Sequence, residues 1–186
     1  MENWTLFLDR DGVINEQLPG DYVKTVDEFR FKQDFIDEIA SLSSIFSRIF
    51  VVTNQQGIGK GIMTLDDLDH IHAFMLQAVN LHKGRLDRIY VCPHLKELDC
   101  DCRKPKPGML LQAFAEFPDS RPERSILIGD TAADMQAARK AGVIPVGMLH
   151  QNNKDIIWDP QPKYLVDSLE IFRTKVLPLV LPERHD

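Results

Sequence analysis

Short apolar runs alternate with longer amphipathic segments along most of the chain. Residues 4–8 form an apolar run typical of a buried strand, whereas residues 34–47 have apolar positions at the spacing of a helix packed on a sheet. The predicted strands are residues 4–8, 49–52, 86–91, 125–128, 144–146 and 164–166, and the predicted helices are residues 34–47, 65–82, 109–117, 134–140 and 169–176. Because strands and helices alternate, the pattern predicts an α/β fold with a doubly wound, mostly parallel sheet.

Polar side chains follow three of the predicted strands, at the point where each strand ends. Asp9 and Asp11 come directly after the first strand, Thr53 follows the second, and Asp130 follows the fourth. The carboxyl ends of parallel strands meet at one edge of the sheet, where ligands bind in open α/β folds. An ordinary Asp-Gly turn at Gly12 would explain the first pair alone. All three strand ends together predict a single polar crevice.

These polar groups are suited to binding a metal and a phosphate. Asp9 and Asp11 would repel each other unless a cation lay between them, and Asp130 can complete an oxygen ligand set for Mg²⁺. The Thr53 hydroxyl can donate to phosphate oxygens. Residues 103–108 contain two prolines that stiffen the chain, so that a lysine of this run, Lys104 or Lys106, can be held in place as a phosphate-binding cation. The alternative for this basic run is a solvated loop.

All three cysteines lie within residues 92–102, together with one histidine. Three thiolates and one imidazole form the closed tetrahedral set typical of structural Zn²⁺, with no open position for catalysis. The expected ligands are Cys92, His94, Cys100 and Cys102, and the alternative is three buried thiols beside an unrelated histidine. A zinc-binding loop at residues 92–102 would brace the segment that leads to Lys104.

Composition limits the remaining functional classes. A chain of 186 residues, 44% hydrophobic and 27% charged, is long enough for one globular domain, which we expect to span residues 1–186. The net charge of −6 and the absence of an aromatic and basic stripe argue against nucleic-acid binding. We find no membrane-spanning run and no signal segment, and therefore expect a cytoplasmic protein without a membrane partner. The histidines outside the zinc loop are interpreted as helix-surface, loop or tail residues: His70, His72, His82, His150 and His185.

The chain resembles the haloacid dehalogenase superfamily, because four motifs occur in the same order. They read Phe-Leu-Asp-Arg-Asp-Gly, Val-Val-Thr-Asn-Gln, Lys-Pro and Gly-Asp-Thr-Ala-Ala-Asp. This resemblance implies a Rossmann-like core and phosphoryl transfer through an aspartyl-phosphate. It further implies that Asp9 is the nucleophile, and that Asp11 protonates the leaving oxygen and then activates water.

The same resemblance implies roles for the other strand-end residues. Thr53 and Lys104 would bind the transferring phosphoryl group. Mg²⁺ would be held by Asp9, the backbone carbonyl of Asp11, and Asp130, and Asp134 would support this site from behind the ligands.

Within the superfamily, the Cys-x-His loop that runs into Cys-Arg-Lys-Pro is similar to a small, capless branch containing two phosphatases. One removes the C7 phosphate of D-glycero-D-manno-heptose 1,7-bisphosphate, and the other hydrolyses histidinol phosphate. Residues 55–61 are more similar to the heptose enzymes, although those often have Lys where this chain has Thr131. We therefore expect a Mg²⁺-dependent hydrolase of the heptose bisphosphate, with histidinol phosphate as the alternative substrate.

We expect a monomeric enzyme whose substrate is a small phosphorylated metabolite. The resemblance to this branch also implies which residues would bind that substrate. The expected substrate contacts are Asp21, Tyr22, Asn54, Gln55, Gln56 and Arg103. Two alternatives of another class stay open, namely a phospho-acceptor protein without catalysis and a zinc-dependent nucleic-acid-binding module.

Overall fold

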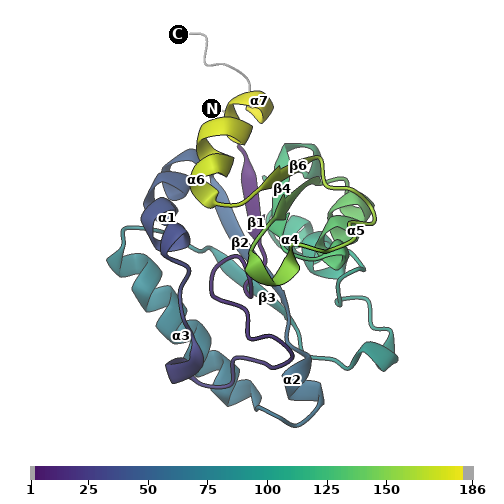
Figure 1. Ribbon diagram of the computed structural model, residues 1–186. Helices are drawn as coiled ribbons and strands as arrows, with labels where there is room; N and C mark the ends of the chain where they lie inside the picture. The colour runs from purple at the N-terminus through teal and green to yellow at the C-terminus, as the bar shows by residue number, and fades with distance from the viewer. Residues whose placement is uncertain (1–2, 182–186) are drawn as a thin grey trace.

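The computed structural model describes residues 3–181, and within them a six-stranded parallel sheet forms the centre of the molecule (Figure 1). The strands are β1 (Thr5–Leu8), β2 (Arg48–Asn54), β3 (Arg88–Cys92), β4 (Ser125–Gly129), β5 (Ile144–Met148) and β6 (Tyr164–Val166). Their order is β3-β2-β1-β4-β5-β6, and all neighbouring pairs are parallel. The chain therefore reverses its winding direction at β1, and the predicted doubly wound α/β fold is confirmed.

Helices cover both faces of the sheet (Figure 1). They are α1 (Gln33–Ile45), α2 (Gln56–Gly59), α3 (Leu65–Leu81), α4 (Gly108–Glu116), α5 (Ala132–Ala141), α6 (Leu169–Ile171) and α7 (Leu177–Val180). A π-helical turn at Phe172–Val176 joins α6 to α7, and 3-10 turns lie at Val26–Glu28, Lys96–Leu98, Pro122–Arg124 and Gln151–Asn153.

Alternate residues of β1 belong to two separate apolar cores. Leu6 and Leu8 pack with side chains of α1, α3 and α6, whereas Phe7 packs on the opposite face with side chains of α4 and α5. The Phe7 ring lies 5.4 Å from the ring of Phe50 and meets Phe114 edge-on at 5.5 Å. Since β1 is buried on both faces, the residues that follow it are held in a fixed position.

Element bounds differ from the predicted ones by up to two residues in strands and helices alike, except at the last helix. The last helix was predicted to end at residue 176, but its turns continue through α7 to Val180. The sequence pattern did not predict α2, because its glycines are poor helix formers. Packing explains one of them: a Cβ on Gly59 would lie 2.8 Å from the carbonyl oxygen of Pro93.

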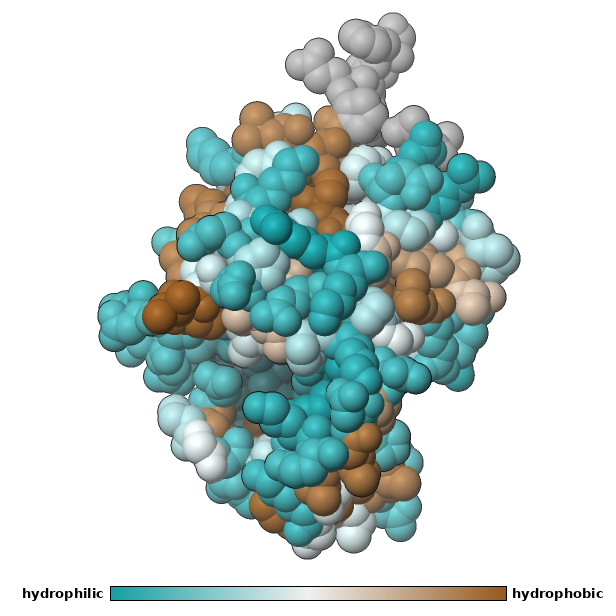
Figure 2. All heavy atoms as spheres, turned by 90° about the vertical axis from the view of Figure 1, so that its right-hand side faces the viewer, coloured by the Kyte–Doolittle hydropathy of each residue, from teal (hydrophilic) through white to brown (hydrophobic). Residues whose placement is uncertain are grey.

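The surface is mainly hydrophilic on the face shown in Figure 2, where polar side chains surround a hollow and apolar groups form separate patches. Among the described residues, no helix has both the length and the apolar character needed to cross a membrane.

Candidate active site and metal sites

The carboxyl ends of the central strands surround a cavity of about 180 Å³. β1 ends immediately before Asp9, Thr53 lies near the end of β2, and β4 ends immediately before Asp130. The predicted site residues that line this cavity are Asp9, Asp11, Asp21, Tyr22, Thr53, Asn54, Lys104 and Asp130. The structure thus brings residues from four distant segments of the chain around one space large enough for a phosphoryl group.

Lys104 is the cation among the residues that line this cavity, and it is only 5% exposed. Its Nζ lies 2.8 Å from Asp9 Oδ1 and 2.6 Å from Asp134 Oδ1, and it donates to the carbonyl of Val52 at 2.8 Å. The Asn54 side chain donates to the backbone carbonyl of Lys104 at 3.0 Å and accepts from the backbone N–H of Lys104 at 3.1 Å. Burial would lower the pKa of Lys104, but Asp134 and Asp9 outweigh it and hold the pKa above its ordinary value.

Three buried carboxylates gather beside this lysine. One carboxylate oxygen from each of Asp9, Asp130 and Asp134 lies within 4.8 Å of the other two. Burial raises the pKa of Asp9 well above its ordinary value; Lys104 opposes this shift, and Asp134 and Asp130 add to it. Burial also raises the pKa of Asp130. One ammonium does not balance three carboxylates, so a hard divalent cation such as Mg²⁺ fits this oxygen donor set.

Gly12 and Gly129 make room for these acids. A Cβ on Gly12, whose φ is +88°, would lie 2.1 Å from Asp130 Oδ2, and a Cβ on Gly129 would lie 2.3 Å from the side chain of Asp134. Thr131 is the N-cap of α5 and forms a capping box with Asp134. In this chain, position 131 therefore orients an acid of the cluster.

Asp11 lines the cavity, and its carboxylate accepts hydrogen bonds from residues that lie outside the cavity lining. Its oxygens accept from Arg10, from Asn15 Nδ2 at 2.9 Å and from Gln55 Nε2 at 2.8 Å. Burial would raise the pKa of Asp11, but the Arg10 charge and these hydrogen bonds outweigh it and hold the pKa below its ordinary value. Gln55 Nε2 also lies 2.8 Å from the Thr53 hydroxyl, so that it links the acid to the threonine.

Three of the expected substrate contacts do not line the cavity. Gln55 is fully buried and uses its amide within the protein. Gln56 and Arg103 are partly exposed, and the Arg103 guanidinium donates to Gln56 Oε1 at 2.9 Å. These two residues form a pair between α2 and the segment that leads to Lys104.

Two histidines contact residues at the strand ends, which the sequence analysis did not predict. His72 was interpreted as a surface or loop residue, but it is 7% exposed and its Nε2 lies 3.4 Å from Arg10 Nη1. Its position, four residues after Leu68 and three before Met75, places it on the buried face of α3 and was a usable signal.

His150 follows the end of β5 and contacts the acid cluster. Its Nδ1 accepts from the backbone N–H of Asn152, so Nε2 carries the proton and donates to Asp130 Oδ2 at 2.8 Å. The position of His150 just beyond a strand end is the same signal that identified Asp9 and Asp130.

The four expected zinc ligands lie together at the end of β3. Cys92 Sγ is 3.4 Å from Cys100 Sγ, Cys100 Sγ is 3.5 Å from Cys102 Sγ, and His94 Nδ1 is 3.2 Å from Cys102 Sγ. Bonds of about 2.3 Å from zinc to sulfur give sulfur–sulfur separations of roughly 3.8 Å in a tetrahedron. The cysteines are free thiols, and the donor set fits a zinc ion.

A family model described as HAD-hydrolase-like matches residues 101–171 of the chain. Over 135 residues, the chain is 41% identical to D-glycero-alpha-D-manno-heptose-1,7-bisphosphate 7-phosphatase of Mycobacterium tuberculosis, which covers 73% of this chain and 71% of that relative. The enzyme of the same name from Campylobacter jejuni is 37% identical over 179 residues, or 94% of this chain and 99% of that relative.

Among solved structures, the fold is similar to D,D-heptose 1,7-bisphosphate phosphatase from B. bronchiseptica, determined in complex with magnesium and phosphate. The TM-score is 0.87 and the sequence identity 29%, and the match covers 95% of this chain and 99% of that one. A close structural relative thus binds the two ligands that the carboxylate cluster and Lys104 are suited to hold.

Proposed function

The chain belongs to the family of the D-glycero-D-manno-heptose-1,7-bisphosphate 7-phosphatases among the HAD-like hydrolases, and we propose that it removes the C7 phosphate of D-glycero-D-manno-heptose 1,7-bisphosphate. The observation that carries this proposal is the buried Lys104 Nζ, which lies 2.8 Å from Asp9 in a cavity that Thr53 and Asp130 also line. This arrangement offers a nucleophile, a fixed cation and a metal-binding acid to one phosphoryl group.

In the proposed reaction, Asp9 attacks phosphorus while the bond from phosphorus to the C7 oxygen breaks, and Asp11 gives a proton to that oxygen. Water then attacks the aspartyl-phosphate, and Asp11 takes the proton from the water. Asp9 is released as a carboxylate together with inorganic phosphate. Asp9 and Asp11 both line the cavity, as these two steps require.

The remaining residues of the cavity neutralise and orient the phosphoryl group. Lys104 and the Thr53 hydroxyl donate to its oxygens. Asp9, the carbonyl of Asp11, and Asp130 would hold Mg²⁺, which supplies positive charge opposite an anionic substrate. Asp134 supports this site by fixing Lys104, whose Nζ it contacts at 2.6 Å.

Contacts with the sugar are assigned to Asp21, Tyr22 and Asn54, because these residues line the same cavity. Gln56 and Arg103 lie outside the cavity and offer a guanidinium to the second phosphate of a bisphosphate. Gln55 is fully buried, and its proposed role is to orient Asp11 and Thr53 rather than to contact the sugar.

The decisive test is a comparison of phosphate release from the α and β anomers of the heptose bisphosphate and from histidinol phosphate, with Mg²⁺, on one purified sample. We expect kcat/KM for a heptose bisphosphate to exceed that for histidinol phosphate by at least ~10²-fold, because only the bisphosphate offers a second anion to Arg103. Faster hydrolysis of histidinol phosphate would contradict the substrate assignment while leaving the phosphatase assignment in place.

The loop at residues 92–102 is proposed to bind a structural Zn²⁺ through Cys92, His94, Cys100 and Cys102. Support comes from the convergence of the four donor atoms and from two backbone hydrogen bonds that join the start of the loop to α2 and to the residue before it. These bonds are Gln55 N–H to Cys92 O at 2.7 Å and Gly59 N–H to Pro93 O at 3.0 Å. We propose that the loop folds as part of one domain spanning residues 1–186 and holds the segment that carries Lys104.

Removal of zinc is therefore expected to loosen residues 92–108 and to lower activity by about 10-fold or more, because Lys104 follows the last ligand by two residues. The measurement is hydrogen exchange together with phosphate release, after chelation, gel filtration and the return of Mg²⁺. Cys100→Ser should reproduce the effect, whereas Leu98→Ser, at an exposed position in the same loop, should not. Unchanged exchange and activity after verified zinc loss would refute the bracing role.

A further inference from the structure

Arg10 lies between the two acids at the end of β1, yet it does not line the cavity. Its side chain is completely buried, and its backbone N–H donates to Asp9 Oδ1 at 2.8 Å. A guanidinium cannot lose its proton in a protein, so its charge must be balanced within the fold. The partners of Arg10 therefore indicate what its burial achieves.

Asp11 is the carboxylate that balances this charge. Arg10 Nη2 lies 2.9 Å from Asp11 Oδ1 and 3.0 Å from Oδ2, and Nε reaches Oδ1 at 3.3 Å. Asn15 and Gln55 donate one further hydrogen bond each. The Asp11 side chain is 28% exposed and lines the cavity, whereas its three hydrogen-bond donors do not line it. The donors therefore fix the carboxylate on its protein side, and its remaining surface is open to the cavity.

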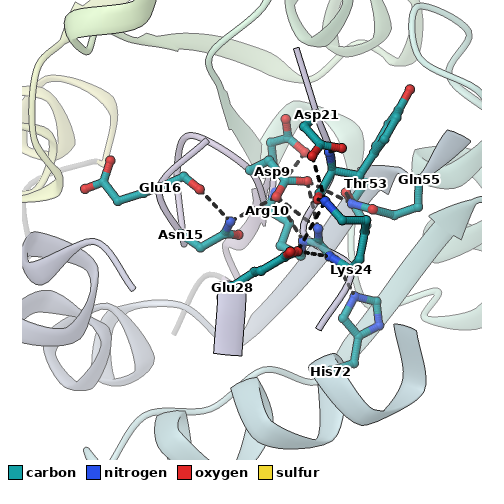
Figure 3. Close-up of polar contacts among 12 residues, drawn as sticks. Asp9, Arg10, Asn15, Glu16, Asp21, Lys24, Glu28, Thr53, Gln55 and His72 are labelled. Atoms are coloured by element: carbon teal, nitrogen blue, oxygen red, sulfur yellow. Dashed lines mark hydrogen bonds and ion pairs between the residues drawn. The ribbon is translucent and has the colours of Figure 1, made fainter. Parts of the chain in front are cut away.

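Arg10 is itself held by a separate element of the fold. Figure 3 shows His72 extending from α3 toward Arg10, with Nε2 at 3.4 Å from Nη1. The guanidinium also lies over the ring of Phe29, at 5.9 Å from its centroid. Burial lowers the pKa of His72 to about 4, so the ring is neutral near pH 7 and can accept a hydrogen bond from Arg10 without adding charge.

We propose that Arg10, anchored by His72, is a positioning residue that orients the Asp11 carboxylate as the base that activates water in the second half of the reaction. This inference rests on the function proposed above. In that step, water forms a bond to phosphorus, the bond between phosphorus and the Asp9 oxygen breaks, and Asp11 takes the proton from the water. Formation of the aspartyl-phosphate depends less on the orientation of Asp11 when the leaving group departs without a proton.

The test uses p-nitrophenyl phosphate, whose leaving group needs no proton, in rapid-mixing experiments with the Mg²⁺-loaded protein. In Arg10→Lys the charge is kept but the two-pronged contact with Asp11 is lost. We expect dephosphorylation to slow by about 10²-fold, the cost of a misplaced catalytic group. Nitrophenolate should then appear in a burst approaching one per active site, and acid-quenched protein should carry the phosphate.

Substitutions on α3 provide a second route that leaves Arg10 in place. His72→Leu removes the acceptor at Arg10 Nη1 and should produce a smaller burst, whereas His72→Gln restores an acceptor and should suppress it. His70→Leu, at an exposed position on the same helix, should behave as the wild type. A purely structural role for Arg10 would reduce the number of active molecules without producing a burst.

The outcomes separate the inference from the proposed function. Wild-type protein that neither releases phosphate nor forms a phosphoenzyme would overturn the proposed function. Wild-type turnover together with no burst in Arg10→Lys and His72→Leu would overturn the positioning role alone.

Discussion

Replacing Asp9 by asparagine should abolish phosphate release, with kcat reduced by at least ~10⁴-fold, while the protein stays folded. The amide has almost the same shape as the carboxylate, so it preserves the packing at the end of β1. It cannot form the aspartyl-phosphate. Phosphate release with saturating substrate and Mg²⁺, compared with circular dichroism and thermal unfolding, checks both parts of the prediction.

Asp27→Asn is the matched control, because Asp27 is exposed and does not line the cavity. Acid quenching after mixing with ³²P-labelled substrate should trap label on the wild type and none on Asp9→Asn. The label should disappear from the wild type within a turnover, whereas a phospho-acceptor protein without catalysis would keep it. Retention of a few per cent of wild-type turnover by Asp9→Asn would rule out Asp9 as the nucleophile.

Replacing Lys104 by methionine should lower kcat by about 10³-fold, because the transferring phosphoryl group loses a donor that is fixed in place before the reaction. The loss should persist at saturating Mg²⁺, since the proposed role of the lysine is to contact the phosphoryl group in addition to neutralising charge. The fold should also be less stable, by about 3–5 kcal/mol, because Asp9 and Asp134 would be left buried without their ammonium partner. Steady-state kinetics and thermal unfolding measure the two effects.

Lys106→Met serves as the control for this substitution. Lys106 is two residues away and partly exposed, and its Nζ pairs with Asp99 and Asp101 rather than with the cavity. It should retain wild-type kcat. Equal losses in the two variants would show that Lys104 acts only through the general charge of the loop.

The hydrophobic pattern was sufficient to predict the sheet and the polar cavity at its edge, because parallel strands place their carboxyl ends at one edge. Asp9, Thr53 and Asp130 were identified in this way, although they lie far apart in the chain, and the structure places them around one cavity. The proposed zinc site was equally accessible from the sequence, since three thiols and an imidazole in one short loop have few other uses, and the structure brings these four side chains together.

The direction of individual side chains was harder to predict. Gln55 follows β2 among polar residues and was expected to touch the substrate, yet it is buried and bonds Asp11 and Thr53. His150 was expected in a loop without a role, yet it donates to Asp130. Neither outcome follows from residue type, because each depends on which partner the folded chain brings within hydrogen-bonding distance.

The sequence by itself determined the order of strands and helices along the chain, the acids at the strand ends and the cluster of three cysteines and one histidine, because periodicity and local spacing are properties of neighbouring residues. Only the tertiary structure decided which groups hold those acids in place. Arg10 contacts His72 from α3, and Lys104 contacts Asp134 from α5. These pairs join segments that are distant in the chain, and they form because a charged or polar group that is buried away from water must find its partners among the groups that the fold brings close to it.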